Sequence, residues 1–161
     1  MTRTCCIFVA LSCAAFASAD TINFCAMIDG AQNGNSSPAT GVLDGVFDTD
    51  TSSFSFSWEI TDQLLSTPAA PGAHIHQGAE GVAGPIVFAF ETGSWELTGA
   101  AIWTGMSIDE INALMNGDLY VNFHTTDFPG GEVRGQINKV PAPGAVALFG
   151  LGGLAATRRR R

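Results

Sequence analysis

Positively charged residues are scarce in this chain. Of its 161 residues only 7 are Lys or Arg, whereas 15 are Asp or Glu. Five of the seven, Arg3 and residues 158–161, lie in terminal segments that we expect to be removed. That removal leaves 2 basic against 15 acidic residues, a net charge of about −13. Such an acidic surface argues against binding of nucleic acids or anionic lipids, and it suits an exported protein or one that attracts cations.

Cysteine is rare where it could cross-link the protein. The chain has 4 cysteines, of which Cys5, Cys6 and Cys13 lie in the expected leader. Cys25 therefore has no partner within the mature chain, and no internal disulfide is expected. Cys25 stands between Phe24 and Ala26 in an expected strand, and this setting favours a buried, inert thiol.

The signatures of common enzymes are also missing. The chain has no Gly-x-Ser-x-Gly motif and no order of Ser, His and Asp that is typical of a catalytic triad. Asp44, Asp48 and Asp50 are not spaced as in a calcium-binding loop. No catalytic residue is therefore assigned, and an enzymatic role is not the expected one.

The first 19 residues have the pattern of a secretory signal peptide. Arg3 supplies the charged start, residues 5–17 are apolar, and the segment ends in Ala17-Ser18-Ala19. Small residues such as Ala17 and Ala19 flank signal-peptidase cleavage sites, so we expect cleavage before Asp20 and export of the chain.

The last residues resemble a PEP-CTERM sorting tail. Pro141 and Pro143 form a Pro-x-Pro motif, residues 144–157 are small or apolar, and four arginines follow. The resemblance implies processing by an exosortase-type enzyme, although Ala142 stands where that family usually has Glu. Fourteen helical residues span about 21 Å, less than the roughly 30 Å of a bilayer core. Residues 140–161 are therefore expected to give transient membrane anchoring through residues 144–157, with a basic stop on the cytoplasmic side.

About 120 residues remain between these ends, enough for one domain. The clearest strand is residues 51–60, where Phe54, Phe56, Trp58 and Ile60 alternate with three serines and a glutamate. Other expected strands cover residues 21–29, 41–48, 73–77, 85–91, 94–104, 118–125 and 131–138.

One short helix is expected among the strands, from Ile108 to Met115. Ser107 and Glu110 have the spacing of a capping box, and Gly117 is suited to end the helix in the left-handed conformation. The fold class predicted from these elements is all-β, an antiparallel Greek-key-like sandwich or barrel with one short helix.

Two sequence blocks hold all three histidines of the chain. Residues 73–85 read AHIHQGAEGVAGP, and residues 119–125, LYVNFHT, are followed by FPGGEVRGQI at 128–137. Together they resemble the CHRD domain, named for its occurrence in chordin and found in secreted microbial proteins. The resemblance implies a β-rich extracellular domain over residues 20–139, and the family has no generally established activity.

The histidines themselves suggest a metal site. His74 and His76 are two residues apart in an expected strand, so both rings lie on one face. On the strand from Asp118, His124 shares a face with Tyr120 and Asn122, opposite the apolar residues. If these two faces meet, three neutral imidazoles could bind copper or zinc. The alternative is that the three rings hydrogen-bond to loop carbonyls beside the glycine-rich turns.

Two further residues are candidates to support the histidines. Glu132 and Arg134 share a strand face, so they could brace a histidine or form a solvent-facing ion pair. The His-x-His motif in a β-fold is also similar to copper-zinc superoxide dismutases, but no bridging histidine, zinc-ligand cluster, disulfide or guiding arginine has a counterpart here.

The function predicted first is a structural or binding module of the cell surface or extracellular matrix, contacting polysaccharide or matrix protein. A copper- or zinc-binding module is the second possibility, and a small redox enzyme remotely similar to superoxide dismutase is the third.

Overall fold

The computed structural model describes residues 20–141. The predicted signal peptide with Ala17 and Ala19, and the predicted tail from Ala142 onward with Pro143, lie outside the described residues. Pro141 is described and exposed. Within residues 20–141, no helix has the length and apolar character needed to cross a membrane.

Nine strands, one α-helix and one 3-10 helix make up the described chain. They are β1 (Thr21–Asp29), η1 (Ala31–Asn33), β2 (Thr40–Asp48), β3 (Ser53–Ile60), β4 (Pro68–Gln77), β5 (Ile86–Glu91), β6 (Thr98–Trp103), α1 (Ile108–Asn116), β7 (Leu119–Thr125), β8 (Phe128–Gln136) and β9 (Asn138–Lys139).

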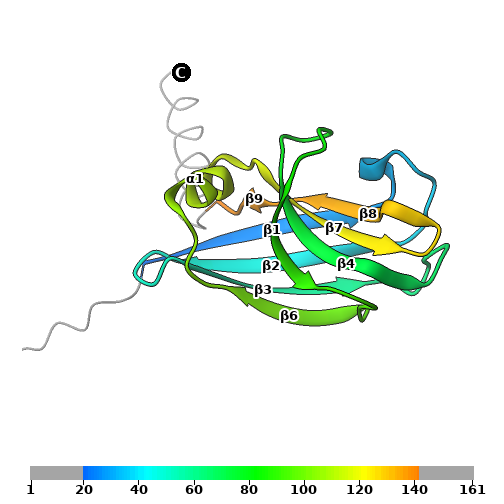
Figure 1. Cartoon of the computed structure of the whole chain (residues 1–161). Helices are drawn as coiled ribbons and strands as arrows, with labels where there is room; N and C mark the ends of the chain where they lie inside the picture. Colours follow the sequence, from blue (N-terminus) through cyan, green and yellow to red (C-terminus); the bar gives the residue numbers. More distant parts are fainter. Residues whose placement is uncertain (1–19, 142–161) are drawn as a thin grey trace, which may run out of the picture.

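All the strands pair in an antiparallel manner within one sheet, in the order β5-β4-β7-β8-β1-β2-β3-β6, with β9 beside β1. The sheet curls into a nearly closed barrel whose two halves face each other, as Figure 1 shows. The halves β5-β4-β7-β8 and β1-β2-β3-β6 join at β8 and β1, through the pair Asp29 and Arg134. Four connections, β3 to β4, β5 to β6, β6 to β7 and β8 to β9, join strands that are not neighbours in the sheet. The predicted all-β, antiparallel, barrel-like fold with one helix is confirmed.

The alternation in β3 works as predicted. Phe54, Phe56, Trp58 and Ile60 are buried, whereas the residues between them are exposed. Their rings pack on aromatic side chains from the opposite half, and Trp58 contacts both Phe90 and Phe123. These contacts across the barrel make its interior a single hydrophobic core.

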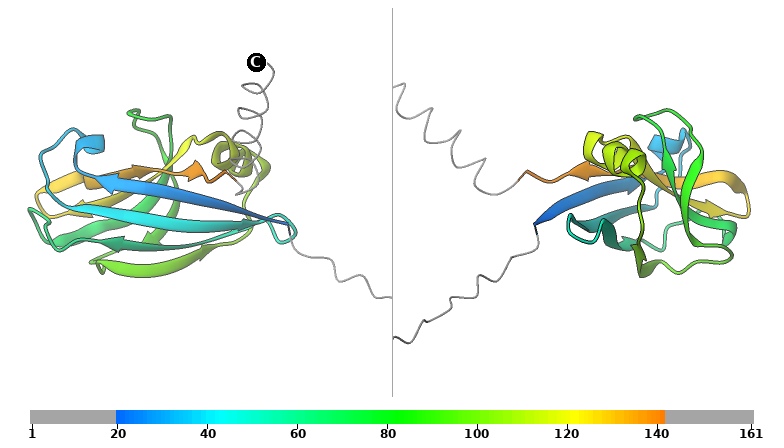
Figure 2. Two further views of the ribbon diagram at one scale, coloured as in Figure 1. Left: turned by 180° about the vertical axis from the view of Figure 1, so that it is seen from behind. Right: turned by 60° about the vertical axis from the view of Figure 1, so that its left-hand side comes forward.

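The predicted helix is present at one end of the barrel (Figure 2). Ser107 and Glu110 form a reciprocal capping box, and Gly117 adopts φ 76° at the C-terminus. The helix extends one residue beyond Met115, to Asn116.

Several predicted boundaries need correction. β4 begins at Pro68 rather than Ala73, and β8 begins at Phe128 and ends at Gln136. β6 covers Thr98–Trp103, whereas a strand over residues 94–104 was predicted. Trp95 lies outside the strand, and its ring is buried in the core, where its Nε1 donates a hydrogen bond to the carbonyl of His124.

The prediction of a buried Cys25 is wrong. Phe24 and Ala26 are each 1% exposed and point into the core, so the residue between them lies on the outer face of β1. Cys25 is half-buried there as a free thiol.

Candidate metal centre

The candidate site lies on the outer face of β4, β7 and β8. Along β7, Leu119, Val121 and Phe123 point into the core, and Tyr120, Asn122 and His124 alternate with them on the other face. All seven residues of β7 are nevertheless buried. An outer face that is buried must be covered by other parts of the chain.

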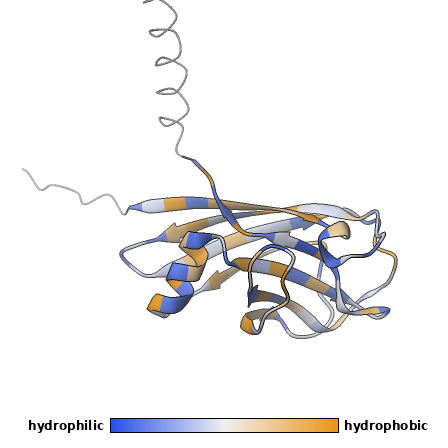
Figure 3. Cartoon of the chain, turned by 90° about the horizontal axis from the view of Figure 1, so that it is seen from above, coloured by the Kyte–Doolittle hydropathy of each residue, from blue (hydrophilic) through white to orange (hydrophobic). Residues whose placement is uncertain are grey.

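Two loops provide this cover. The loop after β4, residues 78–85, accepts hydrogen bonds from Arg134 and Gln136 through the carbonyls of Val82, Ala79 and Gly78. The loop around η1 reaches the same face, where Asn33 donates to the side chain of Asn122. Figures 1 and 2 show both loops on one side of β7 and β8, and Figure 3 shows the alternation of hydrophilic and hydrophobic residues along the strands.

The three histidines meet beneath these loops. The register pairs His74 with Asn122 and His76 with Tyr120, which places His124 diagonally beside His74. One nitrogen from each of the three rings lies within 4.8 Å of the others. The closest pair, His74 Nδ1 and His124 Nε2, is 3.3 Å apart. The three side chains predicted to converge are therefore brought together by the fold.

Backbone carbonyls fix the proton positions of two of the rings. His76 Nδ1 lies 3.0 Å from the carbonyl oxygen of Gly84, and His124 Nδ1 lies 2.9 Å from that of Pro129. Because a carbonyl only accepts hydrogen bonds, each Nδ1 must carry the proton when the ring is neutral. The Nε2 atoms of both rings then carry the lone pair, which is the form that a metal ion binds.

One of these two Nε2 atoms has no hydrogen-bond partner. His76 Nε2 is buried and makes no hydrogen bond, the one such side-chain atom among the described residues. His124 Nε2, in contrast, has His74 Nδ1 as a neighbour. A buried polar atom without a partner is costly, so its presence calls for an explanation.

The surroundings keep the imidazoles neutral. Burial is the leading cause that lowers the pKa of His74, His76 and His124 below the usual value for histidine. Neighbouring rings lower the pKa of His74 and His124 further, and the Arg134 cation lowers that of His76. The carbonyls of Gly84 and Pro129 oppose the shift at His76 and His124. Neutral imidazole is the form that binds metal ions.

The spacing of the nitrogens fits a transition metal. Two nitrogens bound at about 2.0 to 2.1 Å to a tetrahedral zinc lie roughly 3.3 Å apart. The distance between His74 Nδ1 and His124 Nε2 has this value. All three candidate nitrogens lie within 4.8 Å of one another, so the set converges on one point. The hydrogen bonds to Gly84 and Pro129 are those that commonly orient metal-bound histidines.

Glu132 and Arg134 lie on the same face, but neither hydrogen-bonds to a histidine ring or to the other. The fully buried Glu132 carboxylate accepts hydrogen bonds from the hydroxyls of Ser37 and Thr125 and from the amide of Leu65. Glu132 thereby connects β8 to the segments that contain Ser37, Leu65 and Thr125.

Arg134 makes no hydrogen bond to a histidine ring, but it packs on the ring of Tyr120, which in turn packs on His76. No role was predicted for Tyr120 from the sequence. The guanidinium carbon lies 3.4 Å from the centre of the Tyr120 ring. The other neighbour of that ring is His76, with ring centres 4.9 Å apart and planes within 9° of parallel. The Tyr120 hydroxyl also accepts a hydrogen bond from the amide of Gly84. Tyr120 is the only tyrosine of the chain and lies four residues before His124 on the same strand face. This position could have indicated from the sequence that Tyr120 lies beside the histidines.

A family comparison agrees with the two sequence blocks. The model of the CHRD domain matches residues 24–137, most of the described chain. The chain therefore belongs to the CHRD domain family. No curated protein matches the chain.

Proposed function

We propose that this chain is an exported CHRD domain that binds one copper or zinc ion through His74, His76 and His124. The three histidines suit such an ion because their rings are buried and held neutral, and one nitrogen of each lies close to the others. A bound ion of this kind acts as a Lewis acid or, if it is copper, as a redox centre. The residues of the chain hold the rings in position and exclude bulk water.

The unpartnered Nε2 of His76 is the observation that carries this proposal. If the three histidines formed only a structural cluster of hydrogen bonds, each buried ring nitrogen would be expected to have a partner. Both nitrogens of His124 have one, but the Nε2 of His76 does not. A metal ion would give His76 Nε2 its missing partner, and the hydrogen bonds to Gly84 and Pro129 can remain because they are made by Nδ1 atoms.

Metal titration of the full chain tests the proposal. We expect one copper or zinc ion per chain, measured by elemental analysis after gel filtration, and at least a hundredfold weaker binding by His76→Ala. Gln77→Ala is the matched control, because Gln77 is the exposed neighbour of His76 on the same strand. Equal binding by the two variants, or no stoichiometric metal in the wild-type protein, would contradict the metal site.

Export and surface location are the second part of the proposal. The leader ending in Ala17-Ser18-Ala19 and the tail with Pro141 and Pro143 support delivery by signal peptidase and an exosortase-type enzyme. Intact-mass measurement on protein from its natural host should give a chain that begins at Asp20 and lacks the terminal arginines. Full-length chain held stably in the inner membrane would be the opposite result.

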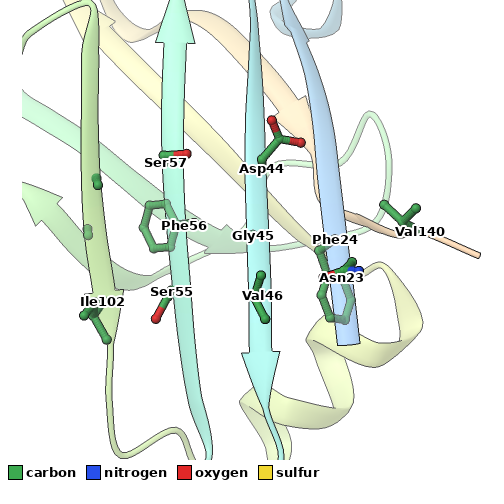
Figure 4. A pocket seen from close by; sticks show the side chains of 12 residues that line it. Asn23, Phe24, Asp44, Gly45, Val46, Ser55, Phe56, Ser57, Ile102 and Val140 are labelled. Atoms are coloured by element: carbon green, nitrogen blue, oxygen red, sulfur yellow. The ribbon is translucent and has the colours of Figure 1, made fainter. Parts of the chain in front are cut away.

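The outer face of β1-β2-β3-β6 supports a further role as a matrix-binding module. A shallow hollow lies on this face, and Val46, Ser55, Ser57 and Ile102 are among the residues that line it (Figure 4). Ile102 is 62% exposed and Val46 is 41% exposed, so the hollow presents apolar side chains to solvent. Replacing both with Glu should release the protein from isolated matrix if this face contacts matrix polysaccharide or protein. Unchanged retention would exclude the face.

A further inference from the structure

We infer that the three-histidine site selects a monovalent ion, Cu(I), over divalent copper and zinc, and that Arg134 contributes to this selectivity. The inference rests on the proposed metal site and specifies the ion that it takes. Three features of the described residues support it: the charge of the ligands, the charge of their neighbours, and the closure of the site.

The ligands bring no negative charge. The set of candidate ligands consists of three histidines, and no carboxylate or thiolate belongs to it. A divalent ion would therefore keep both its positive charges in a buried position, whereas Cu(I) keeps one. Because the cost of burying charge rises steeply with its magnitude, neutral ligands favour the monovalent ion.

The neighbouring charge is also positive. Arg134 lies over one face of Tyr120, and His76 is stacked on that ring, so the guanidinium is within about 8 Å of the His76 ring centre. The only buried carboxylate among residues 20–141, that of Glu132, accepts three hydrogen bonds and is not a candidate ligand. Burial lowers the pKa of the Arg134 guanidinium, and the exposed carboxylate of Glu80 opposes this shift, so Glu80 acts on Arg134 rather than on a histidine. The charged groups that influence the three histidines are the histidines themselves and Arg134.

The site is also closed to a fourth ligand from bulk solvent. His74, His76 and His124 are 4%, 9% and 5% exposed, respectively. Zinc sites in proteins are almost always four-coordinate, and with three protein ligands the fourth is usually water. Cu(I) is stable with three ligands in a plane, so it needs no such water. His74, His76 and His124 beneath the loops offer a three-coordinate site of this kind.

Copper in its two oxidation states gives the sharpest test, because the two ions differ mainly in charge and preferred geometry. The affinity of the full chain for Cu(I) would be measured anaerobically by competition with bicinchoninate, and its affinities for Cu(II) and Zn(II) by competition with chromophoric chelators. We expect the wild-type protein to bind Cu(I) more tightly than either divalent ion. This preference would raise the reduction potential of the bound copper above that of aqueous copper.

Arg134→Gln removes the charge and should lower the ratio of Cu(I) to Cu(II) affinity by about tenfold, for a cation roughly 10 Å from the ion at an effective dielectric constant near 20. For one electron this change equals a fall in potential of about 59 mV. Arg134→Lys keeps the charge and should preserve the ratio within about twofold. Lys139→Gln is the matched control, because it removes the other described basic residue, which is exposed on β9.

The outcomes separate the two proposals. Failure to bind any of the three ions refutes the metal site itself. Metal binding in which a divalent ion is preferred refutes the selectivity alone, and this wild-type comparison remains decisive even if Arg134→Gln does not fold. Equal changes in Cu(I) and Cu(II) affinity on removal of the charge would show that Arg134 has no part in the selectivity.

Discussion

The two halves of the barrel use their outer faces in opposite ways. On β3, the outer residues Ser55 and Ser57 are exposed. On β7, the outer residues Tyr120, Asn122 and His124 also carry polar groups but are buried beneath two loops. Polar residues on an outer face need no explanation when water solvates them. When they are buried, each needs a hydrogen-bond partner, and His76 Nε2 is the one buried side-chain atom among residues 20–141 that has none.

The largest expected effect concerns the inner face that both halves share. Trp58→Ala should lower the free energy of unfolding by about 3 to 5 kcal/mol, because it leaves a cavity among the aromatic rings of the core. Ser57→Ala, on the open outer face of the same strand, should change it by less than about 0.5 kcal/mol. Denaturant unfolding measures both, and equal effects would show that the two faces of β3 are misassigned.

A smaller effect should distinguish the two outer faces. Glu132→Ala would leave three hydrogen-bond donors, on Ser37, Leu65 and Thr125, without their acceptor. Leaving a buried group unpaired costs about 1 to 3 kcal/mol. Asp44→Ala, on the open face of β2, should cost less than about 0.5 kcal/mol. Similar small losses for both variants, again from denaturant unfolding, would mean that the covered face is no more tightly built than the open one.

The same contrast explains which features were predictable from sequence. The alternation in residues 54–60 and the capping box at Ser107 are local patterns, and both produced the predicted elements. The shared face of His74 and His76 also follows from strand geometry alone. These features needed no knowledge of the rest of the fold.

Features that depend on contacts between distant segments were not predictable in this way. The cover over β7 comes from loops about 40 and 90 residues away in the sequence, at Gly84 and Asn33. The stack of Arg134, Tyr120 and His76 joins β8, β7 and β4, and β4 and β7 are neighbours in the sheet although β5, β6 and α1 separate them in the chain. The error at Cys25 has a different cause, because the local pattern was sufficient there. The alternation with Phe24 and Ala26 places Cys25 on the outer face of β1, but the prediction assigned it to the buried face.

The last prediction concerns the pH dependence of stability without metal. Burial lowers the pKa of His74, His76 and His124 in the folded protein, whereas in the unfolded chain each should titrate near 6.5. Below that value the unfolded state binds more protons than the folded state, so the free energy of unfolding decreases as the pH falls. The decrease should begin near pH 6.5 and level off once the pH lies below the lowered pKa values of the folded protein.

Denaturant unfolding of the metal-free protein between pH 8 and 5 measures this loss. His76→Gln should reduce its size, because one of the three titrating groups is removed. Gln77→Ala should leave the profile unchanged, since Gln77 is exposed and does not titrate. Saturating metal should steepen the loss, because protons then compete with the ion for the same nitrogens. A metal-free profile that is flat across the histidine range, or one that rises toward acid, would mean that the three rings are not held neutral by burial. The covered face would then differ from the open one in packing alone.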